Sequence, residues 1–321
     1  MKRKLFCTVL SAVLIFCMSL SAYASQMLIP VGKVVGISLA EGSVTVVAYD
    51  DTYGQKAREV GIQIGDEIVA VDARPVDSAA DLHEALRRSD GSVRIDLSRD
   101  GKPHQVKMEP ALTENGPKLG IYIREGITGI GTVTYYDPGT GNFGALGHGV
   151  SDQQGNLAPM KTGNVYRAAV SDVRQGRVGN PGQLKGSVAA EDVIGSLRCN
   201  TSCGIFGSCS AFRGEALPVA EYAEVKEGHA EILSNISGDA VETFSVEIIK
   251  VFDPEKKNGR DMMLRVTDPD LLKATGGIVA GMSGSPIIQD GKLVGAVTHV
   301  LVNDPTRGYG IMVQNMLKAA A

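Results

Sequence analysis

The sequence lacks the features of a nucleic-acid-binding or membrane-embedded protein. It has no tryptophan, only 5% of its 321 residues are aromatic, and 36 acidic side chains outnumber 32 basic ones, for a net charge of −4. Proteins that bind nucleic acids usually carry a basic face, so we expect no nucleic-acid partner. The chain also contains no glycine-rich phosphate-binding motif, and no run beyond its first segment is apolar enough to span a bilayer.

Cysteine is scarce as well. Cys7 and Cys17 lie in the N-terminal segment, and the remaining three, Cys199, Cys203 and Cys209, are close together in a run rich in Gly and Ser. Three thiols allow at most one disulfide and leave one thiol free, or all three are small buried residues. Their spacing matches no standard zinc pattern and no histidine is nearby, so we expect no metal and no other cofactor.

The remaining composition indicates a globular protein with two domains and mainly β-structure. Hydrophobic residues make up 43% of the chain and charged ones 21%, and 39 glycines separate many short Val- and Ile-rich runs. Such runs, bounded by turn-forming residues, are typical of strands.

The N-terminus has the layout of an export signal. Lys2, Arg3 and Lys4 precede an uncharged apolar run over residues 5–20, and small residues follow before Ser25. This pattern predicts a signal peptide over residues 1–25 that is either cleaved or kept as a membrane anchor. We therefore expect the protein to act outside the cytoplasmic membrane.

Residues 28–110 are predicted to form a small domain that resembles a PDZ domain. Its most specific segment is Gly-Ile-Gln-Ile-Gly-Asp-Glu-Ile over residues 61–68, and a helix is predicted from apolar residues at helical spacing within 79–88. The resemblance implies that a sheet edge accepts a peptide strand while backbone amides hold its terminal carboxylate. The loop that we match to this role contains Val34, Val35, Gly36 and Ile37. The alternative is a domain that packs on its neighbour and binds no peptide.

One serine stands out in the second half of the chain. Residues 276–287 place Ser283 between glycines and between two apolar runs, which favours a nucleophile whose neighbouring amides face an oxyanion. An exposed Gly/Ser turn is the alternative. A serine nucleophile needs a base, and this half offers His148, His229 and His299. His148 has the same glycine-rich surroundings, whereas His229 lies beside charges, so we take His148 as the base.

These segments together resemble the stage IV sporulation protein B (SpoIVB) peptidases. The resemblance rests on the signal, the PDZ domain, Gly-Ala-Leu-Gly-His148-Gly-Val, residues 179–186, residues 276–292, and the closing runs 296–300 and 303–311. It implies a PDZ domain followed by a trypsin-like double β-barrel serine endopeptidase over residues 116–321. Carried over by position, His148 is the general base, Ser283 the nucleophile, and the amides of Gly281 and Ser283 the oxyanion hole. Ser285 takes a structural place in that loop.

The triad acid has several candidates in the sequence. The family resemblance implies Asp268, which lies 15 positions (283 − 268) before the serine and also has the sequence context of a helix cap. Asp152, Asp192 and Asp253 stay open as alternatives. Thr298 and His299 follow on a strand that lines the primary specificity pocket in double-barrel proteases. If His299 faces that pocket, we expect a polar or acidic P1 residue, and otherwise it is a core strand residue.

The biological role follows from the resemblance alone. It implies a self-cleaving signalling protease of sporulation, located between the forespore and mother-cell membranes. Its partners would be its own N-terminal segment, a peptide or C-terminus bound by the PDZ domain, and a membrane-bound regulator whose cleavage lets an intramembrane protease activate a late sigma factor. A different class of function is a catalytically inactive PDZ scaffold that binds a membrane partner.

Overall fold

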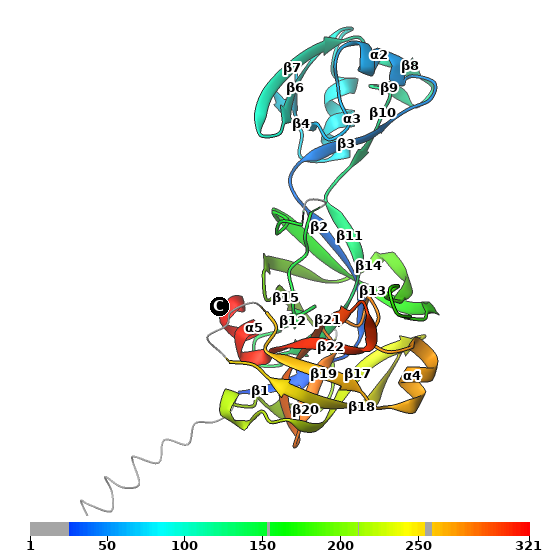
Figure 1. Ribbon diagram of the computed structural model, residues 1–321. Coiled ribbons are helices and arrows are strands. Elements are labelled where there is room, and N and C mark those ends of the chain that lie inside the picture. The colour runs from blue at the N-terminus through cyan, green and yellow to red at the C-terminus, as the bar shows by residue number, and fades with distance from the viewer. Residues whose placement is uncertain (1–25, 153–154, 211, 254–258) are drawn as a thin grey trace, which may run out of the picture.

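The computed structural model of the chain consists of a small domain and two β-barrels (Figure 1). It describes residues 26–152, 155–210, 212–253 and 259–321. The predicted signal or anchor of residues 1–25 lies outside these ranges. Within them, no helix has both the length and the apolar character needed to cross a bilayer.

The first barrel is a ring of six strands. The sheet runs β12-β15-β14-β13-β2-β11-β1-β16, and an additional pairing of β12 with β11 closes it. The ring is formed by β2 (Val34–Ala40), β11 (Ile127–Tyr136), β12 (Asn142–Ala145), β13 (Thr162–Arg174), β14 (Gln183–Thr201) and β15 (Gly204–Cys209). The short strands β1 (Met27–Pro30) and β16 (Leu217–Pro218) extend it beside β11.

The second barrel is a closed ring in the order β17-β18-β19-β22-β21-β20. A single turn of 3₁₀ helix, η1 (Tyr222–Glu224), leads into it, α4 (Pro269–Thr275) connects β19 to the segment before β20, and α5 (Val313–Ala320) ends the chain. The strands are β17 (Gly228–Ser237), β18 (Ala240–Val251), β19 (Met262–Val266), β20 (Pro286–Gln289), β21 (Lys292–Leu301) and β22 (Asp304–Met312). The predicted mainly β fold with a double barrel is confirmed.

The small domain has the sheet and helices of the predicted PDZ domain. Its sheet runs β10-β3-β4-β6-β7, with β5 paired to β4, and the apolar side chains of α3 are buried in a core of its own. Its elements are β3 (Val44–Tyr49), α2 (Gly54–Glu59), β4 (Glu67–Val71), β5 (Arg74–Pro75), α3 (Ala79–Arg87), β6 (Val93–Arg99), β7 (Lys102–Met108), β8 (Ala111–Thr113), β9 (Gly116–Lys118) and β10 (Ile121–Arg124).

The PDZ domain is inserted into the first barrel instead of preceding it. The chain leaves the barrel after β2 and returns in β11, and Leu39 pairs with Ile127 across the two strands (Figure 1). At the point of return Gly126 has φ +75°, and a Cβ there would lie 1.8 Å from the Leu39 carbonyl oxygen, so only glycine fits. The domain therefore spans β3 to β10, later in the chain than the predicted 28–110.

The insertion corrects the predicted peptide-binding loop. The four residues of that loop, Val34, Val35, Gly36 and Ile37, lie in β2 of the barrel. Strand β2 pairs with β11 on one side and with β13 on the other, so neither edge can accept a peptide. From the sequence, the segment is matched to a loop, because its strand partners are more than 85 residues away (127 − 40 = 87 for the nearer one) and leave no local signal.

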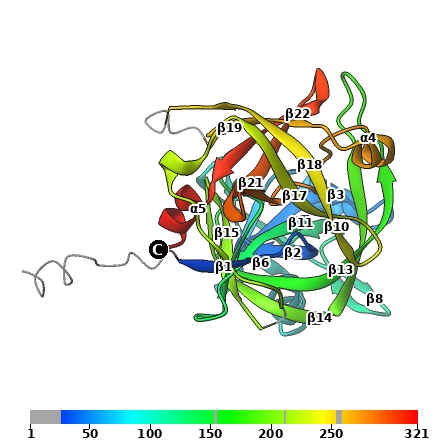
Figure 2. The same cartoon turned by 90° about the horizontal axis from the view of Figure 1, so that it is seen from below.

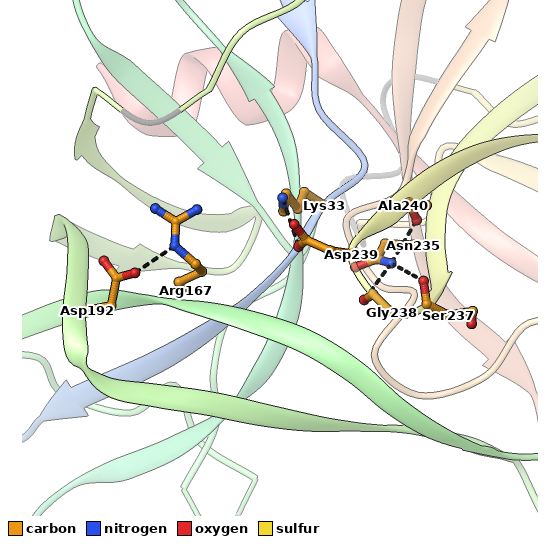
Figure 3. Close-up of polar contacts among 8 residues, drawn as sticks. All are labelled: Lys33, Arg167, Asp192, Asn235, Ser237, Gly238, Asp239 and Ala240. Carbon is orange, nitrogen blue, oxygen red and sulfur yellow. Dashed lines mark hydrogen bonds and ion pairs between the residues drawn. The ribbon is translucent and has the colours of Figure 1, made fainter.

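A turn of the second barrel docks on the first. Buried Asn235 shapes this β17–β18 turn by donating from Nδ2 to the carbonyls of Ser237, Gly238 and Ala240, at 3.2, 3.2 and 2.7 Å (Figure 3). Asp239 at its tip forms a 2.9 Å ion pair with Lys33, just before β2. This turn thus joins the two barrels, and residues of both line one cleft.

Candidate active site

His148 lies just after β12, on a sharp turn of the first barrel. Leu146 and Gly147 both have left-handed backbone angles, at φ 70° and 69°, which is unusual for leucine and turns the chain towards the cleft. The half-buried His148 has its Nδ1 2.9 Å from the Gly149 carbonyl oxygen. Burial lowers the pKa of His148 below 6.5, partly offset by this hydrogen bond. The ring is therefore neutral at neutral pH and can accept a proton.

Ser283 lies in the loop between α4 and β20, and the first barrel holds this loop in place. Thr132, a buried residue of β11, donates its hydroxyl to the Gly281 carbonyl at 2.7 Å and its amide to the Ser283 carbonyl at 3.2 Å. The half-buried Ser283 hydroxyl donates to the Thr298 carbonyl at 2.5 Å. The serine therefore rests on the second barrel, with its loop fastened to the first.

Two amides of the same loop find no acceptor among the residues that the structure describes. Among the described residues, the amides of Met282 and Gly284 donate to backbone carbonyls, whereas the amides of Gly281 and Ser283 donate to none. Gly281 has φ 100°, a conformation that glycine adopts without strain. The two amides expected to form the oxyanion hole are therefore available to a substrate oxygen.

The structure brings the predicted base and nucleophile together. His148, Gly281 and Ser283 all line one cleft of about 700 Å³, whose wall includes the exposed start of β11. Ser285 does not reach it, because this side chain is fully buried and donates to Ser234 Oγ at 3.2 Å. The cleft can thus present a serine, a neutral histidine and two amide donors to one bound carbonyl group.

Of the two predicted specificity residues, His299 lines the cleft and Thr298 does not. His299 lines the cleft, with its ring centroid 5.0 Å from that of His148. Thr298 contributes its backbone carbonyl, but its side chain is buried and donates to the Tyr309 carbonyl at 3.1 Å. The Thr298 side chain therefore faces away from the cleft that His299 lines, because neighbouring residues on a strand point to opposite faces.

Asp268 lies at the start of α4, where it caps the helix. Its Oδ1 accepts from the amides of Asp270 and Leu271, both at 3.0 Å, and its Oδ2 accepts from the amide of Ser245 at 3.2 Å. In Figure 2, α4 lies at the outer side of the second barrel. The helix-cap interpretation therefore describes Asp268, and the expectation of a carboxylate on His148 is not met by this residue.

The alternative acids also have other roles. Asp192 forms a 2.6 Å ion pair with Arg167 across β13 and β14 (Figure 3). Asp152 accepts a hydrogen bond from the Asn156 amide at 2.8 Å within its own turn. Asp253 lies near Tyr222, and it raises the pKa of this tyrosine as the third contribution, after burial and the charge of Asp261. None of the three appears among the residues that line the cleft.

Two residues at the site were not predicted from the sequence. Thr132 is one of three threonines in β11 and is completely buried, as Thr134 is, so its sequence position alone does not single it out. Asn200 lies near the end of β14, two residues before Ser202, which lines the cleft. The residues around Asn200 in the sequence give no signal of its role. Both act through backbone contacts, which motifs do not reveal.

The three clustered cysteines lie on the same hairpin. Cys199 and Cys203 have free thiols and pack against the apolar cluster that includes α5, and Cys209 packs on the core of the first barrel. In the part of the chain that the structure describes, no three His, Cys, Asp or Glu side chains are grouped to hold a metal ion.

Comparison with known proteins identifies the peptidase part of the chain. Residues 115–317, more than half of the chain, match the family model described as SpoIVB peptidase S55. No curated protein matches the sequence.

Three solved structures are similar to parts of the chain. The Rv3671c protease from M. tuberculosis in its active form is 16% identical, with 60% of this chain and 72% of that chain covered and a TM-score of 0.34. The HtrA-type protease AlgW with a decapeptide is 9% identical, with 71% of this chain and 61% of that chain covered and a TM-score of 0.36. The PDZ domain of an SdrC-like protein from Listeria monocytogenes is 23% identical, with 25% of this chain and 85% of that chain covered and a TM-score of 0.22. At such low scores, the fold assignment depends on the strand pairing of this chain.

Proposed function

Because this chain belongs to the SpoIVB peptidase S55 family and is a serine endopeptidase, we propose that Ser283 is its nucleophile and His148 its general base. The observation that carries this assignment is the shared cleft, in which both side chains lie beside two amides that have no acceptor within the described part of the chain. A carbonyl group bound there would meet all the groups that acyl transfer needs.

The reaction begins when the Ser283 hydroxyl leaves the Thr298 carbonyl and turns to Nε2 of His148. As Oγ bonds to the substrate carbonyl carbon, the proton passes to His148, and the amides of Gly281 and Ser283 stabilise the negative oxygen. His148 then gives the proton to the leaving amine, which breaks the peptide bond. Water adds to the acyl-enzyme by the same route and restores the serine.

We further propose that the protease works outside the cytoplasmic membrane of a sporulating cell, where it cleaves its own N-terminal region and a membrane-bound regulator. The export pattern of residues 1–25 and the family membership support this role. Cleavage of the regulator would let an intramembrane protease activate a late sigma factor.

The test of this role is to follow processing of the full chain. We expect mass spectrometry to find a new N-terminus upstream of β1 within the purified protein, and a fluorophosphonate serine inhibitor to prevent its formation. In a spore-forming host in which this chain is the only peptidase of its family, a reporter for the late sigma factor should be active without the inhibitor and inactive with it. Processing at the same site in fully inhibited protein would mean that another protease makes the cut.

The PDZ domain offers a different strand for peptide binding from the one predicted. Strand β10 is an edge of the described sheet and follows Gly120, which has φ +73°, directly after buried Leu119. Its half-buried Ile121 and Ile123 suit an apolar ligand, whereas the other edge, β7, is mostly exposed and polar. We propose that a peptide C-terminus adds to β10, with its carboxylate near the Gly120 backbone.

Hydrogen exchange tests this assignment without a mutation. Peptides with apolar C-terminal residues should slow amide exchange in β10 and leave β7 unchanged, because only the strand that pairs with the ligand gains hydrogen bonds. The same peptides with an amidated C-terminus, which lack the carboxylate, are the control. Protection of β7, or equal protection of β10 by the amidated and the free-acid peptides, would contradict the assignment.

His299 is the proposed specificity residue. His299 has an exposed side chain, but partial desolvation in the cleft, followed by the neighbouring His148 and Arg260, lowers its pKa to about 4, so the ring is neutral at neutral pH. We therefore expect it to select a P1 side chain by hydrogen bonding, which favours polar residues without requiring an acidic one. His299→Ala should lower the preference for polar over apolar P1 residues by about tenfold, the effect of one hydrogen bond of roughly 1.4 kcal/mol.

Profiling of a peptide library with the variant measures this change. His229→Ala is the matched control, because His229 is an exposed histidine on β17 that does not line the cleft. An unchanged P1 profile in His299→Ala would end the proposal.

A further inference from the structure

The group that orients His148 is a backbone carbonyl. In a catalytic triad, a carboxylate on Nδ1 holds the imidazole in the tautomer that leaves Nε2 free to accept the serine proton. Here Nδ1 lies 2.9 Å from the oxygen of Gly149, the next residue in the chain. A carbonyl oxygen can only accept, so Nδ1 carries the proton and Nε2 keeps its lone pair.

Asp268 cannot take this role in the observed fold. Both of its oxygens accept backbone amides, two from the first turn of α4 and one from β18. Removing it from these amides would leave the start of the helix without its cap. The residue is thus explained by structure alone.

Asn200 fixes the segment that contains the carbonyl. At the end of β14, its Oδ1 accepts the Val150 amide at 2.9 Å, and its Nδ2 donates to the carbonyls of Val150 at 2.8 Å and of Ala158 at 2.9 Å. The reversed amide orientation would place NH₂ against an amide and oxygen against two carbonyls, so only one orientation fits. The Ala158 amide also donates to the Val150 carbonyl at 2.9 Å. Asn200 therefore clamps both ends of the loop after His148.

We propose that catalysis uses a Ser283–His148 dyad, in which the Gly149 carbonyl replaces the triad acid and Asn200 is the positioning residue that holds this carbonyl on His148. The inference rests on the proposed roles of Ser283 and His148. It assigns no catalytic role to Asp268. Because Gly149 lies between His148 and Val150, a shift of Val150 moves the carbonyl and lets the ring rotate or change tautomer.

Asn200→Ala and Asp268→Asn test the two halves of the proposal in the full chain. Asn200→Ala should lower kcat by about 10²-fold through misplacement of the base, with KM changed less than about threefold. Asp268→Asn should keep kcat within about threefold, because Asn is an equally good helix cap, whereas the same change in a triad acid costs about 10⁴-fold.

The pH profile separates positioning from general destabilisation. The Gly149 hydrogen bond raises the pKa of His148 against the larger effect of burial, so its loss in Asn200→Ala should move the acid limb of kcat/KM to lower pH. Asn235→Ala is the matched control, because Asn235 also grips three backbone carbonyls but lies away from the cleft. It should lower the free energy of unfolding and leave the acid limb unchanged.

A spectroscopic measurement covers the case in which Asn200→Ala does not fold. In ¹⁵N-histidine-labelled Ser283→Ala protein, neutral His148 should carry its proton on Nδ1. A proton on Nε2, an unchanged kcat and acid limb in folded Asn200→Ala, or a loss of 10³-fold or more in folded Asp268→Asn would each overturn the dyad. Failure of the proposed function is distinguishable, since wild type would then equal Ser283→Ala in turnover.

Discussion

Ser283→Ala is expected to lower kcat/KM for peptide substrates by at least about 10⁴-fold. Without the hydroxyl no acyl-enzyme can form, and only the oxyanion-binding amides and substrate binding remain to accelerate the attack of water. The fold should not change, because the half-buried Ser283 side chain donates one hydrogen bond, to the Thr298 carbonyl. Turnover of a peptide substrate and labelling by a fluorophosphonate probe measure the loss.

Ser285→Ala is the control for this result. Ser285 is two residues away and fully buried, and its hydroxyl donates to Ser234. Its replacement should cost about 1 kcal/mol of stability and keep labelling by the probe. If wild type and Ser283→Ala show the same turnover, the chain is the inactive PDZ scaffold considered above, or Ser283 is not the nucleophile.

Gly284→Ala is expected to damage both activity and stability. A Cβ at this position would lie 2.0 Å from the Thr132 carbonyl oxygen and 2.6 Å from the Leu146 amide nitrogen, and the backbone has φ +99°. These atoms belong to β11 and to the turn before His148, so the nucleophile loop would have to move away from the first barrel. Overpacking and the left-handed backbone together should lower the free energy of unfolding by about 2–5 kcal/mol.

The displaced loop should also reduce kcat by about 10²-fold, because the serine would be moved relative to the base that lines the same cleft. Gly291→Ala is the matched control: it shares a left-handed backbone, at φ +73°, but its Cβ would meet nothing within 4 Å. It should cost about 1–2 kcal/mol and no activity. Urea unfolding and peptide turnover compare the pair, and equal behaviour would show that the contact between loop and barrel is unimportant.

The predictions from the sequence succeeded where function depends on a short contiguous segment. The glycine-rich surroundings of Ser283 and His148 are visible in the chain, because an exposed nucleophile and sharp turns need glycine nearby. The two side chains indeed line one cleft. The helix of the PDZ domain was predicted for the same reason, since Leu82, Ala85 and Leu86 repeat at helical spacing and are all buried.

Predictions that needed a distant partner failed. The run from Val34 to Ala40 is a strand, but it pairs with β11 and β13, on the far side of an inserted domain. Asp268 has the correct residue type for an acid, yet the backbone amides around it make it a helix cap. In both cases the sequence contains the chemical group and only long-range contacts assign its role.

The sequence by itself determined the class of protein: a mainly β chain with a PDZ domain, a serine in a nucleophile loop and a histidine on a glycine-framed turn. Those properties follow from local composition, because backbone conformation and nucleophile exposure depend on neighbouring residues. The tertiary structure alone decided that the PDZ domain interrupts the first barrel, that Thr132 fastens the nucleophile loop, and that a carbonyl lies on His148. These are contacts between segments far apart in the chain, or between a side chain and a backbone carbonyl whose position the fold sets, and residue identity does not encode either of them locally.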